Sequence, residues 1–130
     1  MTLLLDTSIL IALQRNDRFT FNKLEDLKQL HKGMPVISFI SFYEYIHGMR
    51  EKNIKNKDKS AAFIEDFEVL ELYTGNAAII SHLRLTYEKK GKILPLSDLI
   101  IASQAILNNM TLLTRDKDFL EIKELKKIII

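Results

Sequence analysis

The sequence has no cysteine and no tryptophan, and only two prolines and four glycines among its 130 residues. Without cysteine, a disulfide scaffold, a thiolate zinc site and a cysteine nucleophile are excluded. Long hydrophobic runs are missing too, since no uncharged apolar stretch approaches the ~20 residues of a transmembrane helix. We therefore expect a soluble, cytoplasmic protein that makes no contact with a membrane.

A strong charge of either sign is also absent. The chain has 19 Lys and Arg residues against 17 Asp and Glu residues, which gives a formal net charge of +2. This small excess neither indicates nor excludes a nucleic-acid partner. The hydrophobic fraction of 47% suffices for one buried core. Because single domains typically have ~100–150 residues, we expect residues 1–130 to form one domain.

Short apolar runs alternate along the chain with longer segments of helical periodicity. The runs predict strands at 3–5, 36–37, 69–72, 112–113 and 128–130. The periodic segments predict helices at 9–14, 21–30, 41–50, 60–67, 75–90 and 98–108. Continuous apolar runs without alternation are typical of parallel strands buried on both faces. The predicted fold is therefore α/β, a three-layer α/β/α sandwich around a mostly parallel sheet of about five strands.

Ligands of open parallel sheets bind beyond the carboxyl ends of the strands, so acidic residues at those ends are of particular interest. Asp6 follows the first predicted strand, and Asp116 and Asp118 follow the fourth. Asp98 opens a helix that is apolar nearly all round, and Glu44 lies on the helix after the second strand. The fold would bring these strand ends together.

Each acid taken alone has a simpler structural interpretation. Asp6 and Ser97 are typical helix N-caps, Glu44 lies opposite the apolar stripe of its helix, and Asp116 and Asp118 suit a polar turn. Together, however, they predict a pocket of three or four carboxylates. Like charges so close raise one another's pKa, and a bound Mg²⁺ or Mn²⁺ ion offsets that repulsion.

Four segments occur in a characteristic order along the chain: LLLDTSILIAL, PVISFISFYEYIHG, LPLSDLIIASQAI and LLTRDKDF. With this order and spacing, the chain resembles the PIN domain, and within it the VapC-type toxin ribonucleases of type II toxin–antitoxin systems. The resemblance extends from residue 3 to about residue 120. It implies a single PIN-like domain over residues 1–130.

The resemblance also implies roles for particular residues. The residues implied to be catalytic and to bind one or two Mg²⁺ (or Mn²⁺) ions are Asp6, Glu44, Asp98 and Asp116. Asp118 competes with Asp116 for the place of the fourth acid, while Ser8 and Thr114 match small polar positions that support the metal or water. Arg115, at the same strand end, is a candidate for contact with a phosphate.

The activity implied is that of a metal-dependent endoribonuclease. A metal-activated water, oriented by a carboxylate such as Glu44, would attack an RNA phosphodiester and leave 5′-phosphate and 3′-hydroxyl ends. The resemblance further implies a homodimer and inhibition by a cognate antitoxin protein. Two alternatives remain open: a non-catalytic PIN-like module that binds RNA or a partner, and a solitary PIN nuclease outside any toxin–antitoxin system.

Two other classes that gather acids at strand ends fit less well. A phosphoacceptor receiver needs an acidic pair near the first strand, where only Asp6 is present. A haloacid-dehalogenase-like phosphatase needs Asp-x-Asp after that strand, but Ser8 occupies the second position.

Several basic and aromatic residues also invite interpretation. We expect the basic stretch at 50–59 to be solvated, although it suits a nucleic-acid backbone or an acidic partner segment as well. The aromatic side chains expected in the core or a dimer interface are Phe39, Phe42, Tyr43 and Tyr45. The three histidines are expected at the surface or in packing roles.

Overall fold

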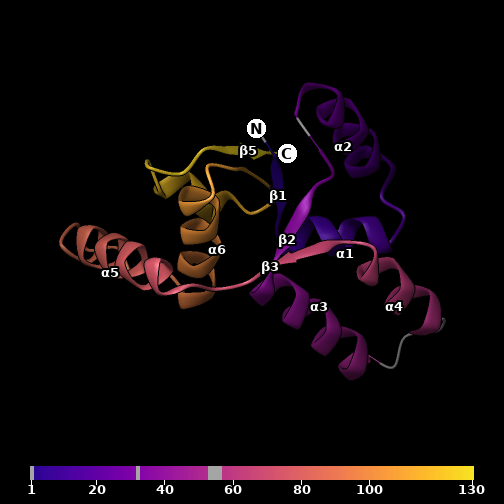
Figure 1. The fold of residues 1–130 in the computed structure, drawn as a ribbon, viewed down its shortest axis with the longest axis horizontal. Coiled ribbons are helices and arrows are strands. Elements are labelled where there is room, and N and C mark those ends of the chain that lie inside the picture. Colours follow the sequence, from indigo (N-terminus) through magenta and orange to yellow (C-terminus); the bar gives the residue numbers. More distant parts are fainter. Residues whose placement is uncertain (1, 32, 53–56) are drawn as a thin grey trace.

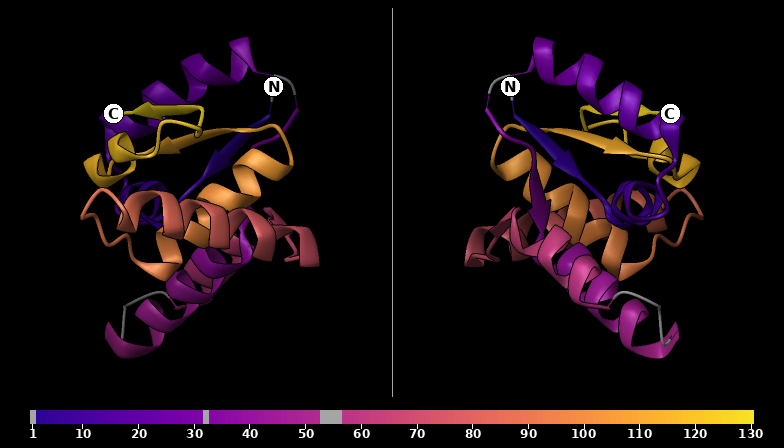
Figure 2. Two further views of the ribbon diagram at one scale, coloured as in Figure 1. Left: turned by 90° about the vertical axis from the view of Figure 1, so that its left-hand side faces the viewer. Right: turned by 90° about the vertical axis from the view of Figure 1, so that its right-hand side faces the viewer.

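The computed structural model describes residues 2–31, 33–52 and 57–130, and a five-stranded parallel sheet forms its centre. The strands are β1 (Leu3–Leu5), β2 (Val36–Ser38), β3 (Glu68–Leu70), β4 (Thr111–Thr114) and β5 (Lys127–Ile129). Their order is β3-β2-β1-β4-β5, and every neighbouring pair is parallel. Figure 2 shows the arrows of β1, β4 and β5 pointing the same way. The predicted parallel sheet is confirmed.

Helices cover both faces of this sheet. The helical elements are α1 (Thr7–Gln14), α2 (Arg18–Leu30), α3 (Phe39–Lys52), α4 (Lys57–Glu65), α5 (Thr74–Glu88), α6 (Leu96–Leu107) and the 3₁₀ turn η1 (Lys117–Glu121). In Figure 1, α5 and α6 lie to the left of the sheet, and α1, α2 and α4 lie to its right. The predicted α/β/α sandwich is therefore confirmed.

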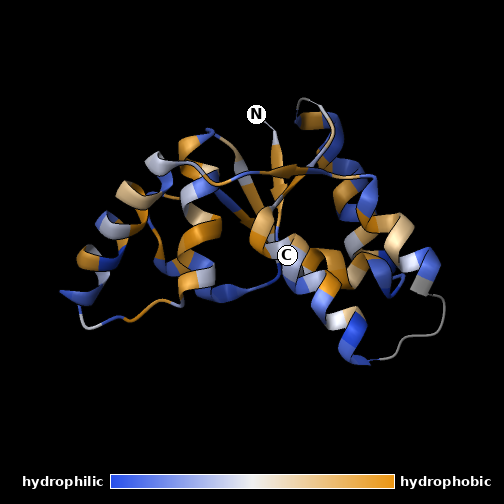
Figure 3. Ribbon diagram, turned by 60° about the horizontal axis from the view of Figure 1, so that its bottom comes forward, coloured by the Kyte–Doolittle hydropathy of each residue, from blue (hydrophilic) through white to orange (hydrophobic). Residues whose placement is uncertain are grey.

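The alternation of side chains along β1 explains why there are two helical layers. Leu4 packs into a core shared with α5 and α6, where Leu99 and Leu112 are fully buried. Leu3 and Leu5 point to the opposite face and join a second core with α1 to α4, which includes Ile9. The strands and inward helix faces are accordingly apolar, while the outer ends of the helices are hydrophilic (Figure 3).

The strands at the edges of the sheet depart from the prediction. The three central strands are buried throughout, as the continuous apolar runs predict. The edge strands β3 and β5 are only partly buried, because each has a neighbouring strand on one side alone. The strand predicted at 69–72 begins earlier and ends at Leu70, and Leu72 beyond it is 45% exposed.

The start of α6 also differs from the prediction. Helix α6 begins at Leu96 with Pro95 as its N-cap, and no side chain caps it by a hydrogen bond. Ser97 is therefore a residue of the first turn, and its predicted capping role is wrong. Proline suits a position where the chain enters a helix, since its fixed φ is compatible with helix entry and it has no N–H to satisfy.

The aromatic residues of α3 divide between the core and the surface. Tyr45 is buried, and its hydroxyl donates to the Ser60 carbonyl oxygen at 3.1 Å. Phe42 packs against the core, whereas Phe39 and Tyr43 are about half exposed. The predicted core position is thus confirmed for Tyr45 and Phe42 only. A dimer interface at Phe39 and Tyr43 stays a prediction.

The basic stretch at 50–59 spans the end of α3 and the start of α4. Arg50 and Lys52 are exposed on the last turn of α3, and Lys59 is exposed on α4. Lys55 lies outside the described residues. Within the described ranges, no helix combines the length and apolar character needed to cross a membrane.

Candidate metal centre

The carboxyl ends of the parallel strands bring the predicted acids to one edge of the sheet. Asp6 directly follows β1, and Asp116 follows β4 after one intervening residue. Glu44 lies in the second turn of α3, the helix that begins where β2 ends. Helix α6 runs back across the sheet before β4, so its first turn, with Asp98, lies at the same edge.

Three of these acids form a close group. One carboxylate oxygen each from Asp98, Asp116 and Asp118 lies within 4.8 Å of the other two. We call these three residues the aspartate trio. Asp116 and Asp118 thus both lie close to Asp98, so the position of neither excludes the other as the fourth acid. The oxygens of Asp6 and Glu44 do not join this group at that distance.

Hydrogen bonds of the β4–η1 turn explain why two aspartates converge. The Thr114 hydroxyl accepts a hydrogen bond from the Asp116 backbone N–H at 2.9 Å. Asp116 in turn caps η1, and its Oδ1 accepts from the Asp118 backbone N–H at 2.9 Å. This Asx-type turn places two carboxylates on one short loop.

Asp6 is held more firmly than any other acid of the edge. It is only 4% exposed, and it caps α1 by accepting from the Ile9 backbone N–H at 3.2 Å. Its Oδ1 also accepts from the Ser8 hydroxyl at 2.6 Å, and its Oδ2 accepts from the Thr114 hydroxyl. The capping role is thus confirmed, and it fixes the carboxylate at the sheet edge rather than competing with a role there.

Glu44 is exposed, as the helical periodicity of α3 predicts, but its carboxylate is not free. Oε1 accepts a hydrogen bond of 2.8 Å from the hydroxyl of Thr7, the first residue of α1. Sequence reasoning did not identify Thr7 as a partner. The one signal in the sequence was that Thr7 directly follows Asp6. That position does not indicate a contact with Glu44, which lies 37 residues further along the chain.

Electrostatics links all five acids. Burial, and after it the charges of Asp116, Asp118, Asp6 and Glu44 in that order of size, together raise the pKa of Asp98 from 3.8 to about 6. Burial also raises the pKa of Asp6, against hydrogen bonds from Ser8 and Thr114 that lower it. Asp98 therefore lies at the electrostatic centre of the group.

The acids of the edge form no ion pair with a basic side chain at 4.0 Å or less in the described part of the chain, residues 2–31, 33–52 and 57–130. Arg115, beside Asp116, lies 3.6 Å from the Asp17 carboxylate instead. A cluster of carboxylates without a cation is costly, since each charged form is destabilised by its neighbours.

The donor set fits a hard divalent cation. Every candidate ligand is a carboxylate oxygen, which Mg²⁺ and Mn²⁺ prefer, and cysteine and histidine ligands are absent from the described part of the edge. Ser8 and Thr114 lie behind the acids and orient Asp6 and Asp116, as the hydrogen-bonding partners of metal ligands do in other proteins.

The fold and the acidic edge together define the class of protein. A family model described as PIN domain matches residues 3–125. The chain therefore belongs to the PIN-domain family.

Within that family the chain resembles VapC proteins, and the comparison covers nearly its whole length. It is 32% identical to Ribonuclease VapC2 of Rickettsia felis over 98% of this chain and 92% of that protein. A VapBC2 structure from the same organism, bound to a fragment of promoter DNA, superposes with a TM-score of 0.83 and 28% identity, covering 100% of this chain and 99% of that one. VapBC-1 from nontypeable Haemophilus influenzae superposes with a TM-score of 0.82 and 26% identity, over 99% and 98%.

Proposed function

We propose that the chain is a divalent-metal-dependent endoribonuclease and the toxin of a toxin–antitoxin pair. The observation that carries the proposal is the aspartate trio, with three carboxylate oxygens within 4.8 Å and no described basic partner. The name of the R. felis relative, a ribonuclease, supports RNA as the substrate. One or two Mg²⁺ or Mn²⁺ ions are the cofactor that the acids suit.

The trio is the part of the edge that would hold the ion. Asp98, Asp116 and Asp118 offer one oxygen each, and Asp6 and Glu44 add negative charge beside them. A bound divalent ion supplies a water of lowered pKa and neutralises charge that develops on a phosphoryl group. The roles of these acids in catalysis are part of the proposal.

Glu44 is placed to handle a proton. Its Oε1 accepts from Thr7, which orients the carboxylate and leaves Oε2 available to accept a proton from water. Both oxygens of Asp6 accept hydrogen bonds, and their remaining lone pairs leave the predicted metal-binding role open to it as well. We infer that Asp6 fixes the negative potential of the site and, with Ser8 and Thr114, the position of the turn that carries Asp116.

The partners follow from the solved relatives. The R. felis and H. influenzae structures are VapBC complexes, so we propose a cognate antitoxin for this chain as well. A homodimer and a cytoplasmic location complete the proposal. Copurification with the product of a neighbouring reading frame tests the antitoxin, and light scattering of the purified chain tests the dimer.

Cleavage of RNA tests the enzymatic proposal. The purified chain is incubated with a pool of structured RNA in Mn²⁺ or in EDTA, alongside Asp98→Asn and the matched surface control Asp58→Asn. We expect cleavage by the wild type and the control in Mn²⁺ only, and none by Asp98→Asn. Cleavage that persists in EDTA or in Asp98→Asn would exclude the metal mechanism. Absence of cleavage by the wild type across many RNAs would support a non-catalytic binding module.

A further inference from the structure

A recess of about 590 Å³ opens beside the candidate metal centre. It lies between the end of α1, the turn into α2 and the residue that follows β4. Three arginines line it, Arg15, Arg18 and Arg115, together with Ser8, Asn16 and Asp17. We call this feature the arginine recess.

The turn that carries the first two arginines has a fixed conformation. Asn16 adopts a left-handed backbone with φ of 60°, which asparagine tolerates better than most residues. The Asp17 N–H donates to the Ala12 carbonyl and the Asn16 N–H donates to the Leu13 carbonyl, both at 3.0 Å. This is the Schellman pattern of a helix end, so the arginines on either side of the turn project from a well-defined backbone.

The charge of the recess is positive and largely uncompensated. Its acid, Asp17, is already engaged: it accepts from the Thr20 backbone N–H at 3.1 Å and lies 3.6 Å from the Arg115 guanidinium. In the described part of the chain, neither Arg15 nor Arg18 forms an ion pair. Both side chains are exposed, so two guanidinium groups are available to an anion.

The recess and the acidic edge share a wall. The Ser8 hydroxyl donates to Asp6 at 2.6 Å and accepts from the Arg115 backbone N–H at 2.9 Å. Arg115 and Asp116 are consecutive, so their Cα atoms are about 3.8 Å apart. One of these residues lines the recess while the other belongs to the trio.

We propose that the arginine recess binds a non-scissile phosphate of the RNA strand, next to the phosphate that lies at the aspartate trio. This inference rests on the proposed function, because it extends the substrate path of the same site. Guanidinium groups suit phosphate oxygens through paired, charge-assisted hydrogen bonds. A continuous polyanion reaching both places explains why positive side chains gather at one side of an acidic centre. An acidic protein segment would have no reason to continue towards the carboxylates.

The salt dependence of RNA binding tests the proposal. Binding of a fluorescein-labelled oligouridylate is measured in EDTA, where no metal-dependent cleavage occurs, at several salt concentrations. We expect Arg15→Ala/Arg18→Ala to bind about tenfold more weakly at low salt. The slope of the logarithm of the association constant against log[salt] should become less negative by about 0.7, since each neutralised phosphate of a single strand contributes about 0.7. The charge-conserving variant Arg15→Lys/Arg18→Lys should keep the wild-type slope and confirms that the turn still folds.

A control pair removes the same charge elsewhere. Arg84 lies in α5 and Lys89 directly follows it, and α5 lies on the opposite side of the sheet from α1 and α2 (Figure 1). The double variant Arg84→Ala/Lys89→Ala should therefore leave the slope unchanged. An alanine variant of the recess that binds RNA with the wild-type affinity and slope would overturn the proposal. An oligoglutamate peptide serves as a second probe, for an acidic protein segment. If the alanine variant of the recess loses binding to this peptide but binds RNA as the wild type does, the proposal is also overturned.

Cleavage in Mn²⁺ separates this proposal from the proposed function. If the wild type cleaves and the recess variant binds and cleaves normally, the function stands and the recess proposal is wrong. If the wild type cleaves no RNA but the recess variant loses affinity and slope as expected, the recess proposal stands and the nuclease proposal is wrong.

Discussion

The acids at the carboxyl edge of the sheet and the acids on the rim of the molecule carry the same charge but meet different partners. On the rim, a hydrogen bond from Lys92 lowers the pKa of Glu121, and hydrogen bonds from Thr20 lower that of Asp17. At the edge, burial and neighbouring carboxylates raise the pKa of Asp98. The chain therefore favours the charged form of these two rim acids, whereas at the edge burial leaves the pKa of both Asp6 and Asp98 raised.

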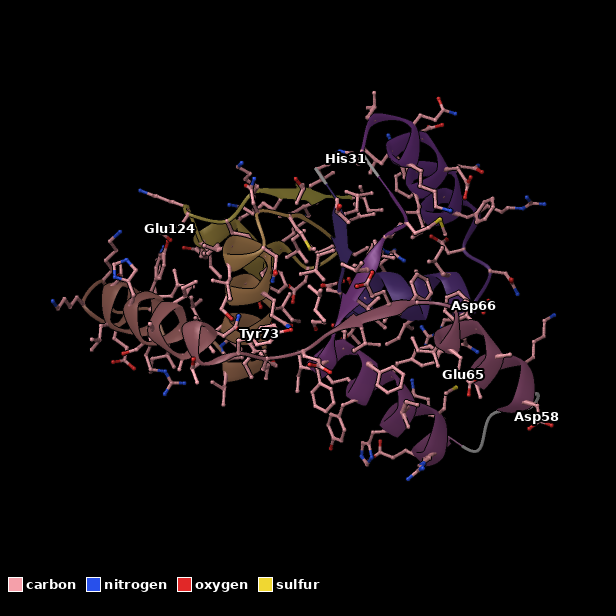
Figure 4. The ribbon with its side chains drawn as sticks, viewed as in Figure 1. His31, Asp58, Glu65, Asp66, Tyr73 and Glu124 are labelled. Atoms are coloured by element: carbon pink, nitrogen blue, oxygen red, sulfur yellow. The ribbon has the colours of Figure 1, made fainter. Side chains whose placement is uncertain are left out.

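Other rim acids need no partner because water solvates them. Figure 4 shows Asp58, Glu65 and Asp66 on and beside α4, and all three are exposed. An exposed carboxylate costs little, while a half-buried group of them costs much more. The contrast supports the proposed divalent cation at the edge.

The largest effect is expected on RNA cleavage when either acid of the β4–η1 turn is replaced. Asp116→Asn and Asp118→Asn should each lower cleavage of RNA by more than about a hundredfold, since even residues behind metal ligands typically cost 10–100-fold. Rates of cleavage of a labelled RNA in Mn²⁺ measure the effect. Asp66→Asn on the rim is the matched control and should retain the wild-type rate. Full activity of Asp118→Asn would contradict a role for Asp118 in holding the metal ion.

A smaller loss is expected from the hydroxyls that orient the acids. Thr114→Val removes the donor to Asp6 and the acceptor of the Asp116 N–H. The Mn²⁺ concentration for half-maximal cleavage should rise about 10–100-fold. Thr86→Val, which removes a hydroxyl bonded to the His82 carbonyl oxygen on α5, is the control. An equal rise in both variants would contradict a specific role for Thr114.

The stability of the metal-free protein should reveal the raised pKa of Asp98. Because its pKa rises from 3.8 to about 6 on folding, Asp98 favours the folded state below pH 4, and that contribution is lost as the pH rises through 6. Thermal melting of the wild type and Asp98→Asn in EDTA should diverge over this range. By pH 7 to 8 the variant should melt roughly 3 to 5 °C higher.

Saturating Mn²⁺ provides the check on this shift. It should raise the melting temperature of the wild type and leave that of Asp98→Asn nearly unchanged, since a ligand stabilises only the state that binds it. If the difference in melting temperature between the wild type and Asp98→Asn in EDTA stays constant from pH 4 to 8, the charged form of Asp98 is not destabilised in the folded protein.

The smallest effect is expected on the rim. Glu121→Gln removes the exposed ion pair with Lys92, and exposed pairs contribute little to stability. The melting temperature should change by about 2 °C or less, and RNA cleavage should be unchanged. A larger loss of stability, or any loss of cleavage, would weaken the distinction between the rim and the edge.

Much of the fold could be predicted from local patterns in the sequence. The apolar runs located the five strands, because parallel strands buried on both faces leave continuous hydrophobic stretches. The limits of β3 were less well predicted, since an edge strand carries exposed residues such as Glu68 and lacks that signal. Helix α6 begins two residues before the predicted start at residue 98, because Pro95, rather than Ser97, is its N-cap.

The candidate site was predicted as a set but not as an arrangement. Asp6, Glu44, Asp98 and Asp116 could be identified because each lies at a strand end or on the helix beside one. That Asp118 joins Asp98 and Asp116 depends on the hydrogen bonds of a five-residue 3₁₀ turn. The contact of Thr7 with Glu44 depends on how α1 meets α3, which no local pattern encodes.

Titration of the purified chain with Mn²⁺ in a calorimeter tests the central claim most directly. We expect saturable binding of one or two ions to the wild type and to the rim control Asp58→Asn. In Asp98→Asn, we expect binding to be lost or weakened more than about a hundredfold. Equal Mn²⁺ binding by the wild type and Asp98→Asn, or no binding by either, would contradict this claim.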